Sequence, residues 1–253
     1  KHMYFSKREF IRYGYRAHPN MTFGMCTKTL VMCHCETGNI WTHLLPAIYF
    51  ILHLIMIFNN AGPYEKFSTN ESKYVQIIGC VSIIFTMSSS AIYHLYGAMS
   101  QHLDNLLLRI DLIGIGIMIF TLTLTSVYAG FYAHHLARNN IMCTMFFIFV
   151  CQITVQMFPC YSQDKYEWHR VVFYCTILLI CISIAVAWVF YFATSEEVKQ
   201  FAARIFLSFF YLGIGFGFYI THFPEKKFRK SKFVHLVLQS HIWWHIFVFA
   251  CGY

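Results

Sequence analysis

Seven apolar runs, each about as long as a bilayer is thick, constrain this chain more than any other feature of its sequence. A membrane helix needs about 20 predominantly apolar residues, because the hydrocarbon core is about 30 Å thick and a helix rises about 1.5 Å per residue. Only 12% of the 253 residues are Asp, Glu, Lys or Arg, against about 25% in soluble domains. The sequence therefore predicts an all-α integral membrane protein, a seven-transmembrane helix bundle. The predicted spans are Ile40–Phe58, Tyr74–Tyr96, Leu106–Tyr128, Ile141–Phe158, Val171–Phe192, Phe201–Thr221 and Phe233–Tyr253.

The basic residues predict the orientation of this bundle. Short loops rich in Lys and Arg stay in the cytosol, and most of the 19 Lys and Arg residues lie in the N-terminal segment and in loops on the same side of the membrane. We expect a cytosolic N-terminus and an extracellular C-terminus, inverted relative to G-protein-coupled receptors. Residues 1–39 would form a cytosolic segment and residues 40–253 the transmembrane domain. The expected protein is multi-pass and resides in the plasma membrane.

The net charge of +8 raises the question of a nucleic-acid partner. The charges lie beside the predicted spans, where they suit lipid head groups. The sequence has neither a basic face nor an aromatic RNA-binding motif. We therefore expect no nucleic-acid partner.

Ionisable side chains inside the predicted spans are candidate functional groups, because each costs at least about 2.5–3.5 kcal/mol to insert. His241 and His245 are four residues apart, which places them on one helical face. This spacing suits two ligands of one metal ion, and equally suits hydrogen bonds to neighbouring helices. The predicted topology brings His94 and Asp111 into the same cytosolic half of the membrane as this pair.

Three imidazoles at one depth favour zinc, which is catalytic when three protein ligands leave a fourth position for water. The predicted Zn²⁺ ligands are His94, His241 and His245. Asp111 would act beside the ion as a general base, or instead form a salt bridge with Arg109 or a histidine. Ser90, one turn before His94, would orient a ligand or stabilise a developing oxyanion.

Two further histidines lie in the first predicted span. His53 is midway along it with no obvious charged partner, and we expect a neutral core histidine. His43 begins the span, and we expect it to be structural or to line the access route of a substrate.

Five sequence blocks, in this order, resemble the signature of the progestin and adipoQ receptor family. Together they extend from residue 14 to residue 245, almost the whole chain, and this combination is highly specific. The blocks are Gly14-Tyr15-Arg16, Glu36-Thr37-Gly38-Asn39-Ile40-Trp41-Thr42-His43-Leu44-Leu45-Pro46, Ser90-Ala91-Ile92-Tyr93-His94, Arg109-Ile110-Asp111-Leu112-Ile113-Gly114, and Ser240-His241 with His245. The wording from Trp41 to Pro46 looks more like the membrane progestin receptor branch than the adiponectin receptor branch.

The resemblance implies a seven-helix bundle with a zinc ion on the three histidines and with Asp111 and Ser90 beside it. Family members are described as receptors for adiponectin or progestins, and the family is similar to alkaline ceramidases. The implied chemistry is hydrolysis of a ceramide-like amide. The implied partners are a membrane lipid, ceramide or free fatty acid, and a steroid or adiponectin-like extracellular ligand. Two alternatives are a receptor in which zinc is purely structural and a transporter, for which repeated halves are not evident.

Overall fold

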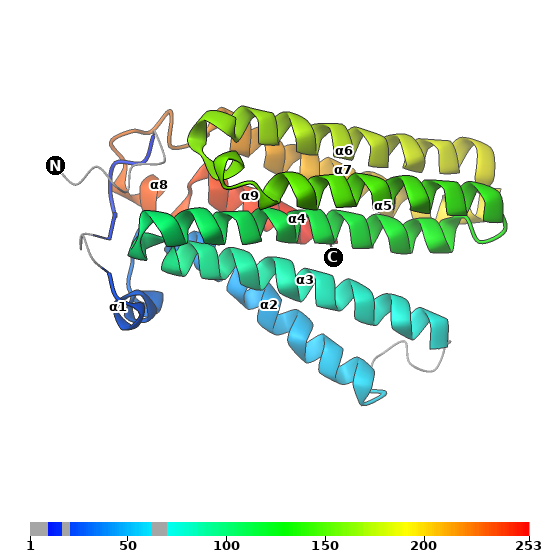
Figure 1. Ribbon diagram of the computed structural model, residues 1–253, viewed down its shortest axis with the longest axis horizontal. Helices are drawn as coiled ribbons and strands as arrows, with labels where there is room; N and C mark the ends of the chain where they lie inside the picture. Colours follow the sequence, from blue (N-terminus) through cyan, green and yellow to red (C-terminus); the bar gives the residue numbers. More distant parts are fainter. Residues whose placement is uncertain (1–9, 17–20, 62–69, 253) are drawn as a thin grey trace. The chain divides into compact units, whose positions relative to one another are not determined.

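A computed structural model describes residues 10–16, 21–61 and 70–252 (Figure 1). The described residues form helices and turns and contain no strand. The α-helices are α1 (Phe23–Lys28), α2 (Thr37–Phe58), α3 (Asn70–Tyr96), α4 (Gln101–Gly130), α5 (His135–Met157), α6 (Glu167–Ala187), α7 (Ser195–Thr221), α8 (Lys232–Val237) and α9 (Ser240–Gly252). Short 3₁₀ turns occupy η1 (Thr29–Val31), η3 (Gly97–Met99), η4 (Pro159–Ser162) and η5 (Asp164–Tyr166), and a π-helical turn, η6 (Trp188–Phe192), follows α6.

Seven helical segments of the described chain are long and apolar enough to cross a membrane, as predicted. Most begin several residues before the apolar run, because the helix continues into the polar flank: α4 starts at Gln101 rather than Leu106 and α7 at Ser195 rather than Phe201. Large apolar side chains such as Phe147 (68% exposed) and Phe190 (75% exposed) lie on the outside of these helices. Such side chains suit a hydrocarbon solvent, so the chain is a multi-pass integral membrane protein.

The structure confirms the seventh predicted span, Phe233–Tyr253, but divides it into two helices. The chain leaves the helix at Leu238 and Gln239, between α8 and α9. The Gln239 side chain is fully buried and donates hydrogen bonds to the carbonyl oxygens of Cys35 and His235. These bonds fix the position of the break. The bond to Cys35 involves a residue far away in the sequence, so the apolar stretch alone does not reveal the break.

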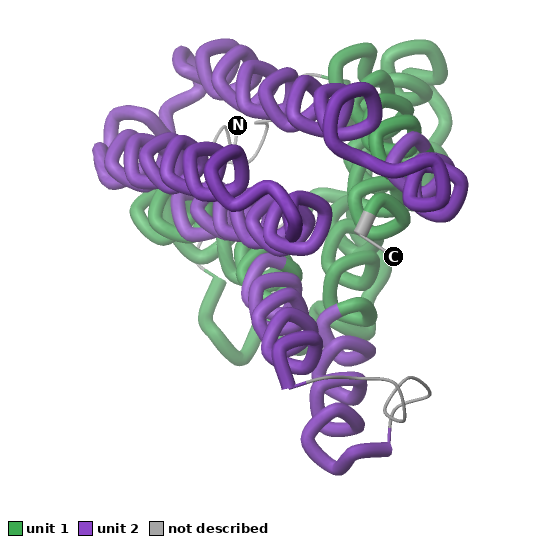
Figure 2. The backbone as a smooth tube through the Cα atoms, turned by 90° about the vertical axis from the view of Figure 1, so that its right-hand side faces the viewer, with its two compact units in different colours: residues 1–46, 87–108, 207–253 green, residues 47–86, 109–206 purple. Residues whose placement is uncertain are grey.

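The chain forms two compact units (Figure 2). Unit 1 comprises residues 1–46, 87–108 and 207–253, and unit 2 comprises residues 47–86 and 109–206. The described part of the predicted cytosolic segment, residues 10–16 and 21–39, belongs to unit 1, whereas residues 1–9 and 17–20 lie outside the described residues. All three predicted metal ligands belong to unit 1, and Asp111 belongs to unit 2.

Unit 2 has a core of apolar contacts and one buried polar cluster. Val127, Phe131 and Trp188 pack together, and Trp188 donates a hydrogen bond from its indole N–H to the carbonyl of Gly130 at 2.7 Å. In the polar cluster, the Gln152 amide and the Tyr174 hydroxyl both donate to the carbonyl of Leu112, at 3.2 and 2.7 Å. These bonds hold α4, α5 and α6 in register where apolar packing alone is not directional.

Candidate metal centre

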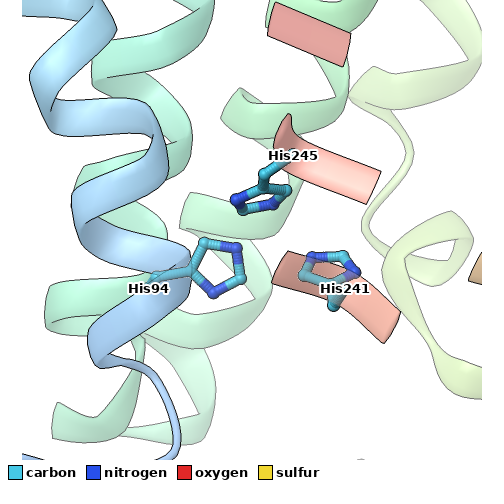
Figure 3. A group of neighbouring side chains, drawn as sticks. All are labelled: His94, His241 and His245. Atoms are coloured by element: carbon cyan, nitrogen blue, oxygen red, sulfur yellow. The ribbon is translucent and has the colours of Figure 1, made fainter. Parts of the chain in front are cut away.

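Three histidine rings of unit 1 converge at one point (Figure 3). His94 comes from α3, and His241 and His245 come from α9. One ligand atom of each lies within 4.8 Å of the ligand atoms of the other two. The His94 ring centroid is 5.3 Å from that of His241 and 5.1 Å from that of His245, and the two α9 rings are 4.6 Å apart. The structure therefore brings together the three residues predicted as metal ligands, in an arrangement that could hold one metal ion.

Hydrogen bonds from the Nδ1 atoms of His94 and His245 determine which nitrogen of these two rings can act as a ligand. His94 Nδ1 donates to the Glu36 carboxylate at 2.9 Å, and His245 Nδ1 donates to the carbonyl of Asn39 at 3.2 Å. A neutral imidazole that donates from Nδ1 carries its lone pair on Nε2. Buried imidazoles oriented in this way are typical of histidine-bound zinc, so the donor set fits that ion.

The start of α2 supplies the groups that orient these rings. Glu36 precedes the helix and also accepts a hydrogen bond from the Asn39 amide at 2.8 Å. Thr42, one turn after Asn39, places its hydroxyl 3.1 Å from His245 Nδ1. Asn39 is fully buried and Glu36 is 17% exposed. One face of α2 therefore positions two of the three imidazoles.

The same face of α2 carries a fourth imidazole. The His43 ring stacks on the His245 ring with centroids 3.6 Å apart and an angle of 11° between the planes. His43 is 6% exposed. The sequence predicts a structural histidine or one that lines an access route, and it does not predict direct contact of His43 with a candidate ligand.

The first turn of α9 is held by a buried carboxylate from the segment between α7 and α8. Glu225, 4% exposed, accepts hydrogen bonds from the Ser240 backbone N–H at 2.7 Å and from the Ser240 hydroxyl. Negative charge at a helix N-terminus stabilises the helix and satisfies a backbone donor that has no partner within it. Glu225 thus fixes the end of the helix that carries His241 one residue later.

Arg16 plays the corresponding part for the helix that carries His94. Its guanidinium donates to the carbonyl of Leu95 at 2.6 Å and to that of His94 at 2.9 Å. Both carbonyls belong to the last turn of α3, where a cation opposes the negative end of the helix dipole. The segment before the first span therefore contributes directly to the frame of the candidate site.

His34, just before α2, is buried and neutral. Its Nε2 donates to the carbonyl of Thr29 at 3.2 Å, and its Nδ1 accepts from the Glu36 backbone N–H at 3.1 Å. Burial, reinforced by the positive charge of Arg16, lowers the pKa of His34 to about 4, although the nearby Glu36 opposes the shift. A neutral His34 uses both ring nitrogens to hold the turn that presents Glu36 to His94.

Three other residues from the sequence prediction have different outcomes. Ser90 is buried in α3, one turn before His94 and in the same unit. Asp111 lies half-buried in the part of α4 that belongs to unit 2. Arg109 donates a hydrogen bond to the carbonyl of Met157 at 3.3 Å. The roles of Ser90 and Asp111 remain predictions.

Sequence reasoning missed the residues that hold the histidines. Glu36 and Asn39 stood inside the block that carries the family resemblance, so their position was a usable signal. Glu225 lies in a polar loop between two spans, and nothing in its surroundings distinguishes it from a solvated carboxylate. A residue such as Glu225 is recognised only once the structure shows its contact with Ser240.

Comparisons with known proteins agree with the resemblance seen in the sequence. The family described as "Haemolysin-III related" matches residues 31–253. The human protein named progestin and adipoQ receptor family member 3 is 25% identical over 241 residues, which cover 94% of this chain and 76% of the relative. The Caenorhabditis elegans progestin and adipoQ receptor-like protein 1 is 24% identical over 250 residues, covering 97% of this chain and 55% of the relative.

A third relative, the Arabidopsis thaliana heptahelical transmembrane protein 1, is 28% identical over 230 residues, which cover 85% of this chain and 65% of the relative. The name of this protein agrees with the seven spans of the structure, and the names of the first two relatives are consistent with the predicted branch. With the family match covering nearly the whole transmembrane part, the chain belongs to the haemolysin-III related family, whose relatives here include the progestin and adipoQ receptors.

Proposed function

We propose that this protein is a receptor of the progestin and adipoQ type that holds a zinc ion within the membrane and hydrolyses the amide bond of a ceramide-like lipid. The convergence of His94, His241 and His245 carries the proposal. Three imidazoles from two helices, two of them oriented through Nδ1, form a donor set that would suit zinc and, with three protein ligands, would leave a fourth position for water. Zinc in such a site supplies a Lewis acid and activates water for hydrolysis.

The chain's own groups would share the remaining work. Glu36 keeps His94 in the tautomer that presents Nε2, and Asn39 does the same for His245. We assign to Asp111 the part of the general base, because a carboxylate in a membrane span is costly to insert and is therefore a candidate functional group. Ser90 would orient the lipid head group or donate to the oxyanion that develops at its carbonyl.

The receptor part of the proposal rests on the family. One of its relatives is named adiponectin receptor protein, from Drosophila melanogaster, and is 28% identical over 155 residues, covering 61% of this chain and 34% of the relative. By that analogy, a steroid or an adiponectin-like extracellular protein would regulate the bundle, and ceramide or free fatty acid would be its lipid partner. We also propose a plasma-membrane location with the N-terminus in the cytosol, on the charge distribution between the loops.

The second candidate function is a receptor in which zinc is purely structural. The three ligands come from two helices that are distant in sequence, so a bound ion would join α3 to α9 without any chemistry. The two candidates differ in what happens when the general base is removed.

Purified protein in lipid nanodiscs, loaded with zinc and supplied with a long-chain ceramide, separates them. We expect wild type to release sphingosine, measured by mass spectrometry, and Asp111→Asn to keep its zinc and fold while losing turnover. Equal release of sphingosine by wild type and Asp111→Asn would refute the proposed hydrolase activity. Retained zinc and fold with no turnover in either protein would favour the structural role.

A further inference from the structure

His43 is a buried imidazole that the proposed metal centre does not use. It lies in the second turn of α2 and is 6% exposed. Within the described part of the chain, neither of its ring nitrogens has a hydrogen-bond partner. A buried polar group without a partner costs free energy, and exceptions concentrate where a ligand or a water molecule completes the bonding.

The stacked arrangement prevents His43 from sharing one ion with His245. An imidazole directs its lone pair in the plane of its ring, and zinc binds at about 2.0–2.1 Å along that direction. The two rings are nearly parallel, at 11°, with centroids 3.6 Å apart. An ion in the plane of the His245 ring therefore lies beyond bonding distance of His43, which leaves His43 as a hydrogen-bonding neighbour.

The residues next to His43 on α2 already orient the ring of His245. The Asn39 carbonyl and the Thr42 hydroxyl both contact His245 Nδ1, so the ring of His245 is oriented without help from the nitrogens of His43. Leu45, two residues further along the same membrane helix, is 56% exposed. His43 is thus a polar group beside the candidate metal site, on a helix that also faces hydrocarbon.

We propose that His43 binds the head group of the lipid ligand, with its ring N–H donating to a carbonyl or carboxylate oxygen of a long-chain acyl compound held next to the three imidazoles. This inference rests on the proposed zinc site. It assigns to His43 a task that neither the metal ligands nor the groups orienting them perform, and it makes His43 a binding residue rather than a metal ligand.

His43→Phe tests the proposal, because phenylalanine keeps an aromatic ring against His245 and removes both ring nitrogens. The matched control is His53→Phe, the same change in the same helix. Zinc content is measured first, and then oleate binding is measured in nanodiscs with and without zinc. We expect His43→Phe to retain its zinc and to bind oleate about 10-fold or more weakly, the loss of one hydrogen bond to a charged group. His53→Phe should bind oleate like wild type, and His43→Asn, which restores a donor, should recover part of the affinity.

Each other outcome has a distinct meaning. Equal oleate affinity in wild type and His43→Phe, or no zinc-dependent oleate binding by wild type, would overturn the role of His43 while leaving the zinc site in place. Loss of zinc from a folded His43→Phe would make His43 part of the metal site and also overturn the proposal. Absence of zinc from wild type would instead refute the proposed function, before any lipid is added. If His43→Phe does not fold, His43→Leu and His43→Asn are compared, and equal oleate affinity in these two variants refutes the proposal.

Discussion

Removal of the Glu36 carboxylate should weaken zinc binding without touching a zinc ligand. The Glu36 oxygen that accepts from His94 Nδ1 at 2.9 Å also accepts from the Asn39 amide at 2.8 Å. Glu36→Gln keeps the shape and one acceptor oxygen but loses the charge and the second acceptor, whereas Glu36→Ala leaves two buried donors without this acceptor. Changes to groups that hold a metal-binding histidine cost about 10- to 100-fold in affinity. We expect the Gln variant at the low end of that range and the Ala variant at the high end.

The affinity is measured by competition with a zinc chelator on protein in detergent at pH 7.5. Glu196→Gln is the control, because Glu196 and its partner Lys199 form an ion pair with side chains 84% and 72% exposed, and such pairs contribute little. The control should bind zinc as tightly as wild type. If Glu36→Ala retained wild-type affinity, the tautomer argument for His94 would be wrong.

Three further predictions follow from the groups around the histidines. Arg16→Ala should lower the midpoint of thermal unfolding, because it removes charged hydrogen bonds of about 1.5–3 kcal/mol each from the last turn of α3. Arg16→Lys should recover part of the loss. An unchanged midpoint in Arg16→Ala would show that these hydrogen bonds do not stabilise the protein. Glu225→Ala should destabilise the protein by about 1–2 kcal/mol through the N-terminus of α9 and weaken zinc binding, whereas wild-type chelator titrations would show that α9 holds its position unaided. The zinc-free protein should lose stability as the pH falls from about 6.5 to about 4, and His34 should account for at most about 3 kcal/mol of this loss. The reason is that the pKa of His34 is depressed in the folded state, so the unfolded chain takes up the proton first. That part of the pH dependence should be missing from His34→Asn, and identical curves for the two proteins would contradict the neutral state of His34.

The sequence was sufficient for the seven membrane spans and for the three histidines that converge in the structure, for two separate physical reasons. Membrane spans follow from local composition, because the bilayer accepts few other structures. The pair at His241 and His245 follows from helical periodicity, and His94 from the cost of an ionisable group in a span. Each of these sequence features depends on residues that are close together in the chain, so it can be recognised without knowledge of the fold.

The interruption of the last span and the groups that hold the histidines depend on contacts between distant segments. Gln239 joins residue 35 to the break between α8 and α9, and Arg16 reaches the end of α3. The residues adjacent to Gln239 and Arg16 in the sequence do not distinguish these two from ordinary polar residues near a membrane surface. The stacking of His43 on His245 likewise needs the placement of α2 against α9.

The central claim is that three converging imidazoles, those of His94, His241 and His245, hold one zinc ion, and elemental analysis of the purified protein tests it most directly. We predict about one zinc per chain in wild type, and its loss in His94→Ala and in His245→Ala under conditions where both variants still show the helical circular dichroism of wild type. Wild-type protein without zinc, or variants that keep a full equivalent of it, would contradict the claim.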